Sequence, residues 1–201
     1  MDIPTNVCVV CKDGPFGYLD GFILDPATDE VTDLIVEADE FLKPKRLVPV
    51  KEIIRSTFRY ILLNCTLHEL SEFEPFADLE DHRLYSWPNT STNPGYLPAQ
   101  HGHIPAQKTV VWGSPYVFAT DGKVGVLDQL IIEPDNHRIT DLLIRVGYFW
   151  GYQDIDIPLA QIKNIKEDSV YLKLNMATIK SFPTIPDHVE KGVSSYSEPV
   201  Q

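Results

Sequence analysis

The sequence predicts an all-β protein: two tandem small β-barrels of five to six strands each, joined by a Pro-rich linker, with little helix. Three observations support this prediction. Residues 13–37 recur as residues 121–145, both copies consist of short apolar runs separated by turn residues, and Pro49 and Pro158 interrupt the next apolar run of each copy. Short strands separated by frequent turn signals are typical of small barrels and sandwiches.

The internal repeat aligns residues 13–37 with residues 121–145 without a gap, and ten of these 25 positions are identical. With one residue of slippage residues 48–53 fall on 157–162, and with two more residues 60–64 fall on 171–175. A unit of roughly 70 residues is too long for a solenoid repeat and matches a small domain. We therefore expect a division into a first barrel at 1–76, a linker at 77–108, a second barrel at 109–183 and a polar tail at 184–201.

Each copy is expected to begin as a meander of strands. The expected strands are residues 7–12, 18–25 and 31–37 in the first copy and residues 124–133 and 138–146 in the second. Asp13 and Gly14 supply a tight turn with positive φ. Because proline fixes φ and donates no ladder hydrogen bond, the segments around Pro49 and Pro158 are expected to be short strands that enter a helical turn.

Closing such strands into a barrel removes their exposed edges. Gly21 lies inside an expected strand, where it would allow a bulge or a tight bend. The second copy has Gln129 at the equivalent position, so the fold itself does not demand glycine there. Residues 77–108 contain four prolines and read as a linker by composition, and the polar tail is expected to be loosely ordered.

Charge and composition exclude several classes of function. The net charge of −12 and the lack of a Lys/Arg stripe count against nucleic-acid binding. No apolar run approaches the roughly 18 residues that cross a bilayer, so no membrane insertion is expected. Three cysteines, an odd number, fit a reducing compartment. We expect a cytoplasmic protein.

The segments from Gly17 to Glu37 and from Gly125 to Arg145, followed by Pro49 and Pro158, resemble the PRC-barrel family. This family is a small β-barrel found in the photosynthetic reaction-centre H subunit and in a bacterial ribosome-maturation factor. The resemblance covers both copies and implies an adaptor or interaction module, with no catalytic residue set. The chain departs from the H subunit in having no transmembrane segment, and from the maturation factor in having a second barrel in its first half.

Cys8, Cys11, Cys65 and His68 have the ligand types and spacing of a zinc site. The second copy offers Tyr116, Ala119, Met176 and Ile179 at the corresponding places, which are packing residues. Residues three apart on a strand also face opposite ways. Buried thiols are therefore the expected use of these cysteines, and no metal site is assigned.

Other polar groups have ordinary structural interpretations. His82, His101 and His103 are linker histidines that would bind a transition metal weakly, and Asp25, Asp29 and Glu30 are hairpin acids without the spacing of a calcium loop. Asp20 and Asp128 are equivalent in the two copies, as are Asp33 and Asp141. A carboxylate that occurs in both copies favours a structural role over an active site, so neither catalytic nor cofactor-binding residues are assigned.

The densest aromatic group is residues 147–152, where the first copy has Glu40, Phe41 and Leu42. It either anchors a partner or packs within the molecule. The leading hypothesis is a non-enzymatic adaptor or scaffold that binds a protein partner through its paired barrels. The alternative is a small-ligand or zinc-binding protein, with the ligand at the cysteines or in the cleft between barrels. The sequence leaves the oligomeric state open.

Overall fold

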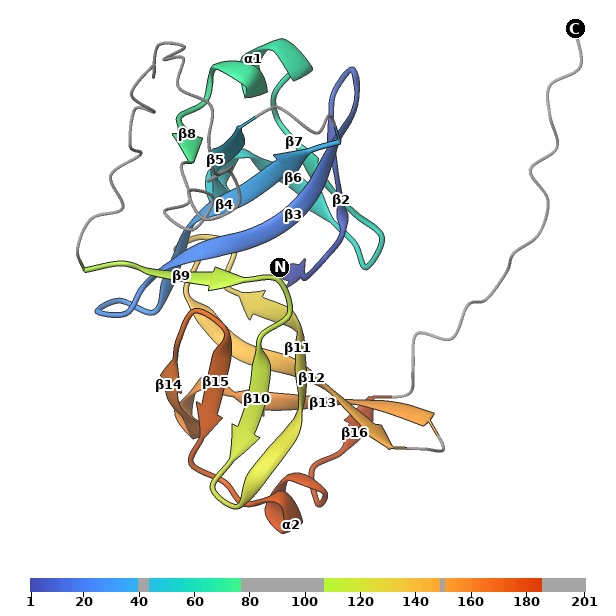
Figure 1. Cartoon of the computed structure of the whole chain (residues 1–201), viewed down its shortest axis with the longest axis vertical. Coiled ribbons are helices and arrows are strands. Elements are labelled where there is room, and N and C mark those ends of the chain that lie inside the picture. Colours follow the sequence, from blue (N-terminus) through green and yellow to red (C-terminus); the bar gives the residue numbers. More distant parts are fainter. Residues whose placement is uncertain (40–43, 77–106, 149–150, 186–201) are drawn as a thin grey trace, which may run out of the picture.

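A computed structural model describes residues 1–39, 44–76, 107–148 and 151–185 of the chain (Figure 1). The described residues are mostly strand, with two short α-helices and two 3-10 helices. The strands form two sheets that curl as half-barrels do. The prediction of a β-rich, barrel-like fold is confirmed. Most of the expected linker and all but two residues of the expected tail lie outside the described residues.

The two sheets have equivalent strand orders, β6-β7-β2-β3-β4-β5-β8 in the N-terminal sheet and β14-β15-β10-β11-β12-β13-β16 in the C-terminal sheet. In addition, β9 pairs with β3 and β1 pairs with β11. The N-terminal sheet contains β2 (Cys8–Cys11), β3 (Gly14–Asp25), β4 (Glu30–Ala38), β5 (Lys45–Pro49), β6 (Ile53–Ser56), β7 (Tyr60–Leu63), β8 (Pro75–Phe76) and β9 (Thr109–Trp112). The C-terminal sheet contains β1 (Asp2–Pro4), β10 (Tyr116–Ala119), β11 (Gly122–Ile132), β12 (Ile139–Tyr148), β13 (Gly151–Pro158), β14 (Ile162–Ile165), β15 (Ser169–Leu172) and β16 (Thr184–Ile185).

The hairpins and proline turns predicted from the sequence are confirmed. The hairpin β3–β4 and its equivalent β11–β12 turn at residues 26–29 and 133–138. Pro49 and Pro158 end β5 and β13 and are the N-caps of the 3-10 helices η1 (Val50–Glu52) and η3 (Leu159–Gln161). Proline can take this position because the first amide of a helix has no partner inside it.

Near its end each repeat has a short helix, whose start is held by a hydrogen bond to the aspartate of the Asp-Gly turn. The Oδ1 atom of Asp13 accepts a hydrogen bond from the amide of Leu67, which begins α1 (Leu67–Glu72), at 2.8 Å. The Oδ1 atom of Asp121 accepts one from Met176, which begins α2 (Met176–Ile179), at 2.9 Å. These carboxylates therefore satisfy amides that a helix N-terminus leaves unpaired.

One part of the predicted repeat alignment is wrong by two residues. In the parallel pairs β2–β7 and β10–β15, Cys8 lies opposite Tyr60 and its equivalent Tyr116 lies opposite Ser169. Tyr60 is therefore equivalent to Ser169 and not to Tyr171. The sequence alignment matched Tyr60 with Tyr171 and Asn64 with Asn175 because these residues are identical. The strand pairing shows that the two extra residues of slippage are not present.

Both long strands, β3 and β11, carry a bulge at an aspartate. Gly21, next to the bulge of β3, is explained by a different contact. The pairing of β3 with β4 skips Asp20, and that of β11 with β12 skips Asp128. A Cβ on Gly21 would overlap the carbonyl oxygen of Val111, because β9 passes close by. The second repeat has Gln129 at the equivalent place and forms the same bulge. The bulge therefore does not require glycine, whereas the close approach of β9 to Gly21 does.

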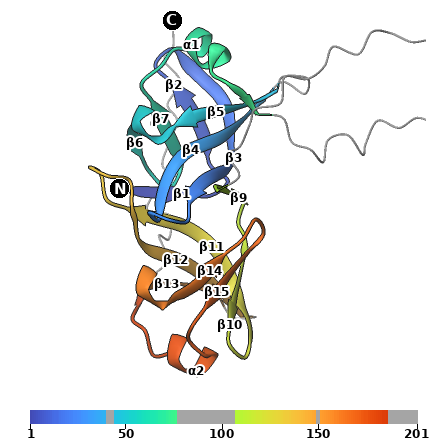
Figure 2. The same ribbon diagram turned by 90° about the vertical axis from the view of Figure 1, so that its left-hand side faces the viewer.

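The two repeats exchange their first strands. Figure 1 shows β9 leaving the C-terminal half to lie along β3, and Figure 2 shows β1 at the boundary with β11. Ile3 lies opposite Leu130, and Val111, its equivalent, lies opposite Phe22, so the two exchanged strands have the same register. An antiparallel bridge joins the equivalent residues Glu30 and Arg138. The junction therefore has approximate two-fold symmetry.

The exchange produces one continuous hydrophobic core. A single cluster of buried side chains extends from Ile3 in β1 to Ile179 in α2 and includes residues of β1 to β5, β7 and β9 to β15. Ile3 and Val111 are completely buried at the crossing. Because burial of apolar surface is the main favourable term in folding, the two halves stabilise each other directly.

We predict that Ile3→Ala destabilises the whole chain by about 2–5 kcal/mol, the usual cost of truncating a buried Ile or Leu. Ile3 contributes to both halves, so the loss should appear in one cooperative transition. Urea unfolding followed by tryptophan fluorescence and by far-UV circular dichroism measures it. Asp2→Ala, an exposed change in the same strand, is the control. Two separate transitions, with only one of them shifted, would contradict the shared core.

Candidate functional site

A cleft of about 520 Å³ opens where the two halves meet. One wall is the β3–β4 turn, including Asp25 and Asp29, and the other is built from η3, β14 and the residue after β15, Lys173. Thr109, at the start of β9, and Ile139, at the start of β12, also line it. Each repeat supplies one wall, so the cleft exists because the strands are exchanged.

The two walls of the cleft carry opposite charges. Asp25 and Asp29 are half-buried on the first wall, while Lys163 and Lys173 are exposed on the second. Asp25 uses Oδ1 to accept the amide of Ala27 at 2.9 Å, and Lys173 donates to the carbonyl of Ala160 at 2.8 Å. Among the described residues, the side chains of Asp29 and Lys163 form neither a hydrogen bond nor an ion pair.

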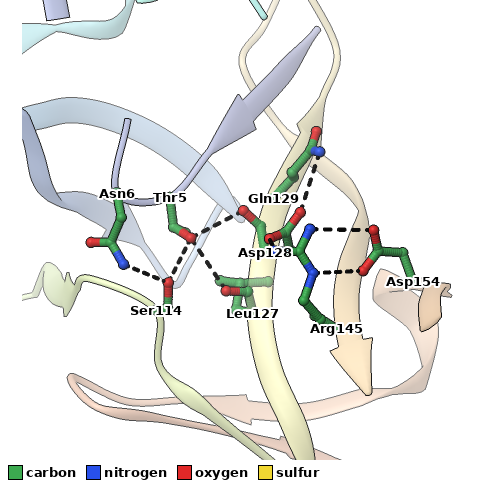
Figure 3. Close-up of polar contacts among 8 residues, drawn as sticks. All are labelled: Thr5, Asn6, Ser114, Leu127, Asp128, Gln129, Arg145 and Asp154. Carbon is green, nitrogen blue, oxygen red and sulfur yellow. Dashed lines mark hydrogen bonds and ion pairs between the residues drawn. The ribbon is translucent and has the colours of Figure 1, made fainter. Parts of the chain in front are cut away.

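A polar network fixes the chain as it leaves β1 (Figure 3). The hydroxyl groups of Thr5 and Ser114 are 2.7 Å apart, and the side-chain amide of Asn6 donates to the Ser114 hydroxyl at 2.9 Å. The Thr5 hydroxyl also donates to the carbonyl of Asp128, whose oxygen accepts the Thr5 amide as well. The network ties the first repeat to the bulge of β11.

The bulge aspartates form ion pairs, as a structural role requires. Arg145 holds Asp154 with two hydrogen bonds, at 3.1 Å and 3.4 Å, and its other terminal nitrogen lies 3.0 Å from Asp128 (Figure 3). In the N-terminal sheet, Lys45 lies 2.8 Å from Asp20. Lys45 occupies the position equivalent to Asp154, so the two copies neutralise the same bulge with a cation from different strands.

The other aspartate that occurs in both repeats, Asp33 in the first and Asp141 in the second, has different neighbours in the two copies. Asp33 is 3.7 Å from the ammonium of Lys108. Asp141 lies near Asp156, and burial, followed by repulsion from Asp141, raises the pKa of Asp156. The first repeat has Leu47 at the place of Asp156, packed against a small outer cluster of Ile23, Ile35, Phe76 and Val110.

The cysteines are brought together only in part. The Sγ atoms of Cys11 and Cys65 are 3.9 Å apart and buried, whereas His68 has 84% of its side chain exposed and faces Glu72. Burial raises the pKa of Cys11 to about 12, with Cys65 adding to the effect, and burial also raises the pKa of Cys65 and Cys8. The thiols are therefore protonated at neutral pH, although zinc binds the thiolate.

The remaining sequence candidates lie apart from the cleft or outside the described residues. Residues 40–42, His82, His101 and His103 are among those not described. The aromatic group at 147–152 spans the tip of the β12–β13 hairpin, of which residues 149–150 are not described. In the described ranges, no three side chains of His, Cys, Asp or Glu gather closely enough to hold a metal ion.

Each sheet also presents apolar side chains to solvent on three neighbouring strands. On β7, β2 and β3 the residues Tyr60, Cys8 and Tyr18 form one cross-strand row, and Tyr18 is 54% exposed. On β15, β10 and β11 the equivalent row consists of Ser169, which is buried, Tyr116, which is 50% exposed, and Val126. Phe118 and Tyr171 stack beside it at 5.5 Å. We call these two surfaces the tyrosine faces.

The chain matches no protein family model and no curated protein. In the part of the chain that the structure describes, no helix combines the length and the hydropathy needed to cross a bilayer. The sequence predicts a cleft between barrels and, separately, names Asp25 and Asp29 as hairpin acids, and the structure places both acids in that cleft. The sequence signal that points to it is divergence between the copies: Asp29 and Lys163 stand where the other copy has His137 and Ile54.

We predict that Arg145→Met destabilises the protein by about 3–5 kcal/mol, because Asp154 is 1% exposed and would keep a buried, unpaired charge. Lys45→Met should cost about 1 kcal/mol or less, because its partner Asp20 is 29% exposed and water can solvate the carboxylate that is left. Chemical unfolding at neutral pH measures both. The double variant Arg145→Glu/Asp154→Lys copies Glu37 and Lys45 of the first repeat and should recover much of the loss. Equal costs for the two single variants would contradict the pairing.

We predict that Asp156→Asn stabilises the protein at neutral pH. The folded-state pKa of Asp156 is raised above its usual 3.8, so the folded state binds this proton more tightly than the unfolded state does. The cost of the buried charge is present above the folded pKa and disappears as pH falls through it. Urea midpoints should therefore differ at pH 7 and converge near pH 4. Asp135→Asn, in an exposed turn, should show no such difference.

Proposed function

We propose that this chain is a non-enzymatic adaptor in which two PRC-barrel-like repeats, near residues 1–76 and 109–183, bind a protein partner in the cytoplasm. The observation that carries the proposal is the pair of tyrosine faces. Both repeats expose a tyrosine in the same cross-strand pair, Cys8–Tyr18 in one and Tyr116–Val126 in the other. The tyrosines come from opposite strands of this pair, so each repeat exposes a tyrosine although the two positions are not equivalent.

The chemistry of the tyrosine faces suits a protein surface. Tyrosine offers a large apolar ring with a polar tip and loses little side-chain entropy on binding, and it is enriched among residues that dominate interface energies. Lys123 lies 3.4 Å above the ring of Tyr116, which adds a cation at the edge of one face. The shared core supports the proposal further, because it joins both faces in one body, and a partner that spans both would bind more tightly than one that contacts either alone.

The repeated aspartates are consistent with a non-enzymatic role. Asp20 and Asp128 neutralise Lys45 and Arg145 at bulges that shape the sheets. A carboxylate engaged in the same way in both copies serves the fold. The buried free thiols of Cys11 and Cys65 agree with the reducing conditions of a cytoplasmic location.

The test is cross-linking and affinity purification of the tagged full chain from its own source under mild conditions. If the proposal is right, one protein is captured in stoichiometric amount. Each of Tyr18→Ala and Tyr116→Ala should weaken its binding by roughly 30-fold, as about 2 kcal/mol at an interface centre does. Phe58→Ala, equally exposed but on the β6–β7 turn, is the matched control.

Two results would contradict the adaptor proposal. One is a captured protein whose binding is unchanged in the double variant Tyr18→Ala/Tyr116→Ala, and the other is a chain that carries no protein. Native mass spectrometry of the same preparation detects bound zinc or a small molecule, which are the alternative functions. Between these two, the cleft with its oppositely charged walls favours a small ligand as the second candidate.

A further inference from the structure

From its two oppositely charged walls we infer that the cleft between the repeats binds a small zwitterion of about dipeptide size, with an ammonium group toward Asp25 and Asp29 and a carboxylate toward Lys163 and Lys173. This inference deepens the second candidate function and does not depend on the tyrosine faces.

The charges of the cleft are placed to receive a charged ligand. Asp29 is half-buried and, within the described ranges, forms no ion pair, although Arg138 donates from Nε to the carbonyl of the neighbouring Thr28 at 3.0 Å. Lys163 on the facing wall forms no ion pair either. Asp25 keeps Oδ2 available after capping Ala27, and the Lys173 ammonium has two donors left after its bond to Ala160. A zwitterion satisfies both walls at once, whereas a simple anion or cation would meet a like charge on one of them.

The floor of the cleft is apolar and its size fits a small organic molecule. Leu24, Ile139 and Ile162 are buried residues that line it, and Leu159 is half-buried beside them. A volume of about 520 Å³ lies in the range of roughly 300–1,000 Å³ typical of small-molecule sites, which combine apolar lining with a few polar groups. The ligand therefore has an apolar body between its charged ends.

The repeat itself shows that the fold does not require these features. Thr109 lies opposite Leu24, and its equivalent in the exchanged strand is Met1, which is bonded to Ile132 and packs on the core. Asp29 is matched by His137, which has the same left-handed backbone, with φ of 58° against 59°. Lys163 is matched by Ile54. The combination of Thr109, Asp29 and Lys163 is thus found on one side of the pseudo-symmetric junction, and the fold does not depend on it.

The experiment is calorimetric titration of the full chain with a panel of zwitterionic dipeptides built from Ala, Val, Leu and Phe, together with thermal unfolding. At least one should bind with Kd below about 1 mM and raise Tm, because ligand binding to the folded state stabilises it. The N-acetyl form of that dipeptide lacks the cation and the C-amide lacks the anion. Each should bind at least tenfold more weakly.

Three variants locate the site. Thr109→Met places in the cleft the side chain found at the equivalent position and should abolish binding, while Thr109→Ser should retain it. Asp29→Asn should weaken binding tenfold or more, and His137→Asn, the same change at the equivalent turn, should not. All variants should keep the wild-type circular dichroism spectrum. For Asp29→Asn and His137→Asn this is expected because Asn tolerates a left-handed backbone.

The inference is overturned if no dipeptide of the panel binds at about 10 mM, or if binding is unchanged in both Thr109→Met and Asp29→Asn. These outcomes are separable from failure of the adaptor. The cleft variants leave Tyr18 and Tyr116 intact, so capture of a protein partner should be unaffected by them. Conversely, Tyr18→Ala/Tyr116→Ala should bind the dipeptide as the wild type does.

Discussion

The structure depends on the pairing of β1 with β11 and of β9 with β3. Each long strand is covered on one side by its hairpin partner, and on the other side its own repeat covers only the first half, through β2 or β10. The exposed half is an open edge, which would be a site for aggregation. The exchanged strand from the other repeat closes it, with Ile3 and Val111 completely buried. Neither repeat is complete without the other.

This exchange explains which differences between the copies are tolerated. Where the exchanged strands pair, Gly21 lies opposite Trp112 in one copy and Gln129 lies opposite Pro4 in the other. In both pairs a larger side chain lies opposite a small or compact one. Near the bulges, Lys45 of the first repeat is matched by Asp154 and Glu37 is matched by Arg145. The bulge aspartate forms an ion pair with a cation in both repeats. Sequence changes at these places preserve the pairing while they remove the symmetry of the surface.

The sequence predicted what local patterns encode. The hairpins around residues 26–29 and 133–138 and the turns after Pro49 and Pro158 follow from turn chemistry and proline geometry, and all are present. The exchange was missed because β1 has three residues, of which one is proline, and nothing local names its partner. The last strands were misaligned because Tyr60 and Tyr171 share an identity but face different partners. The cleft residues come from five separate segments, and no periodicity links them.

The duplication separates what the fold needs from what it permits. Positions that keep their role in both repeats, such as Asp13 and Asp121 at the helix starts, are explained by backbone hydrogen bonds that every copy must satisfy. The cleft has the opposite character: Asp29, Thr109 and Lys163 each differ in chemistry from His137, Met1 and Ile54, although their backbones superimpose in register. The left-handed backbone at residues 29 and 137 suits Asp and His alike, so the turn itself does not select the acid. The acid at this place is therefore a difference that the fold permits, and it leaves a charged side chain on the wall of the cleft that a ligand could use.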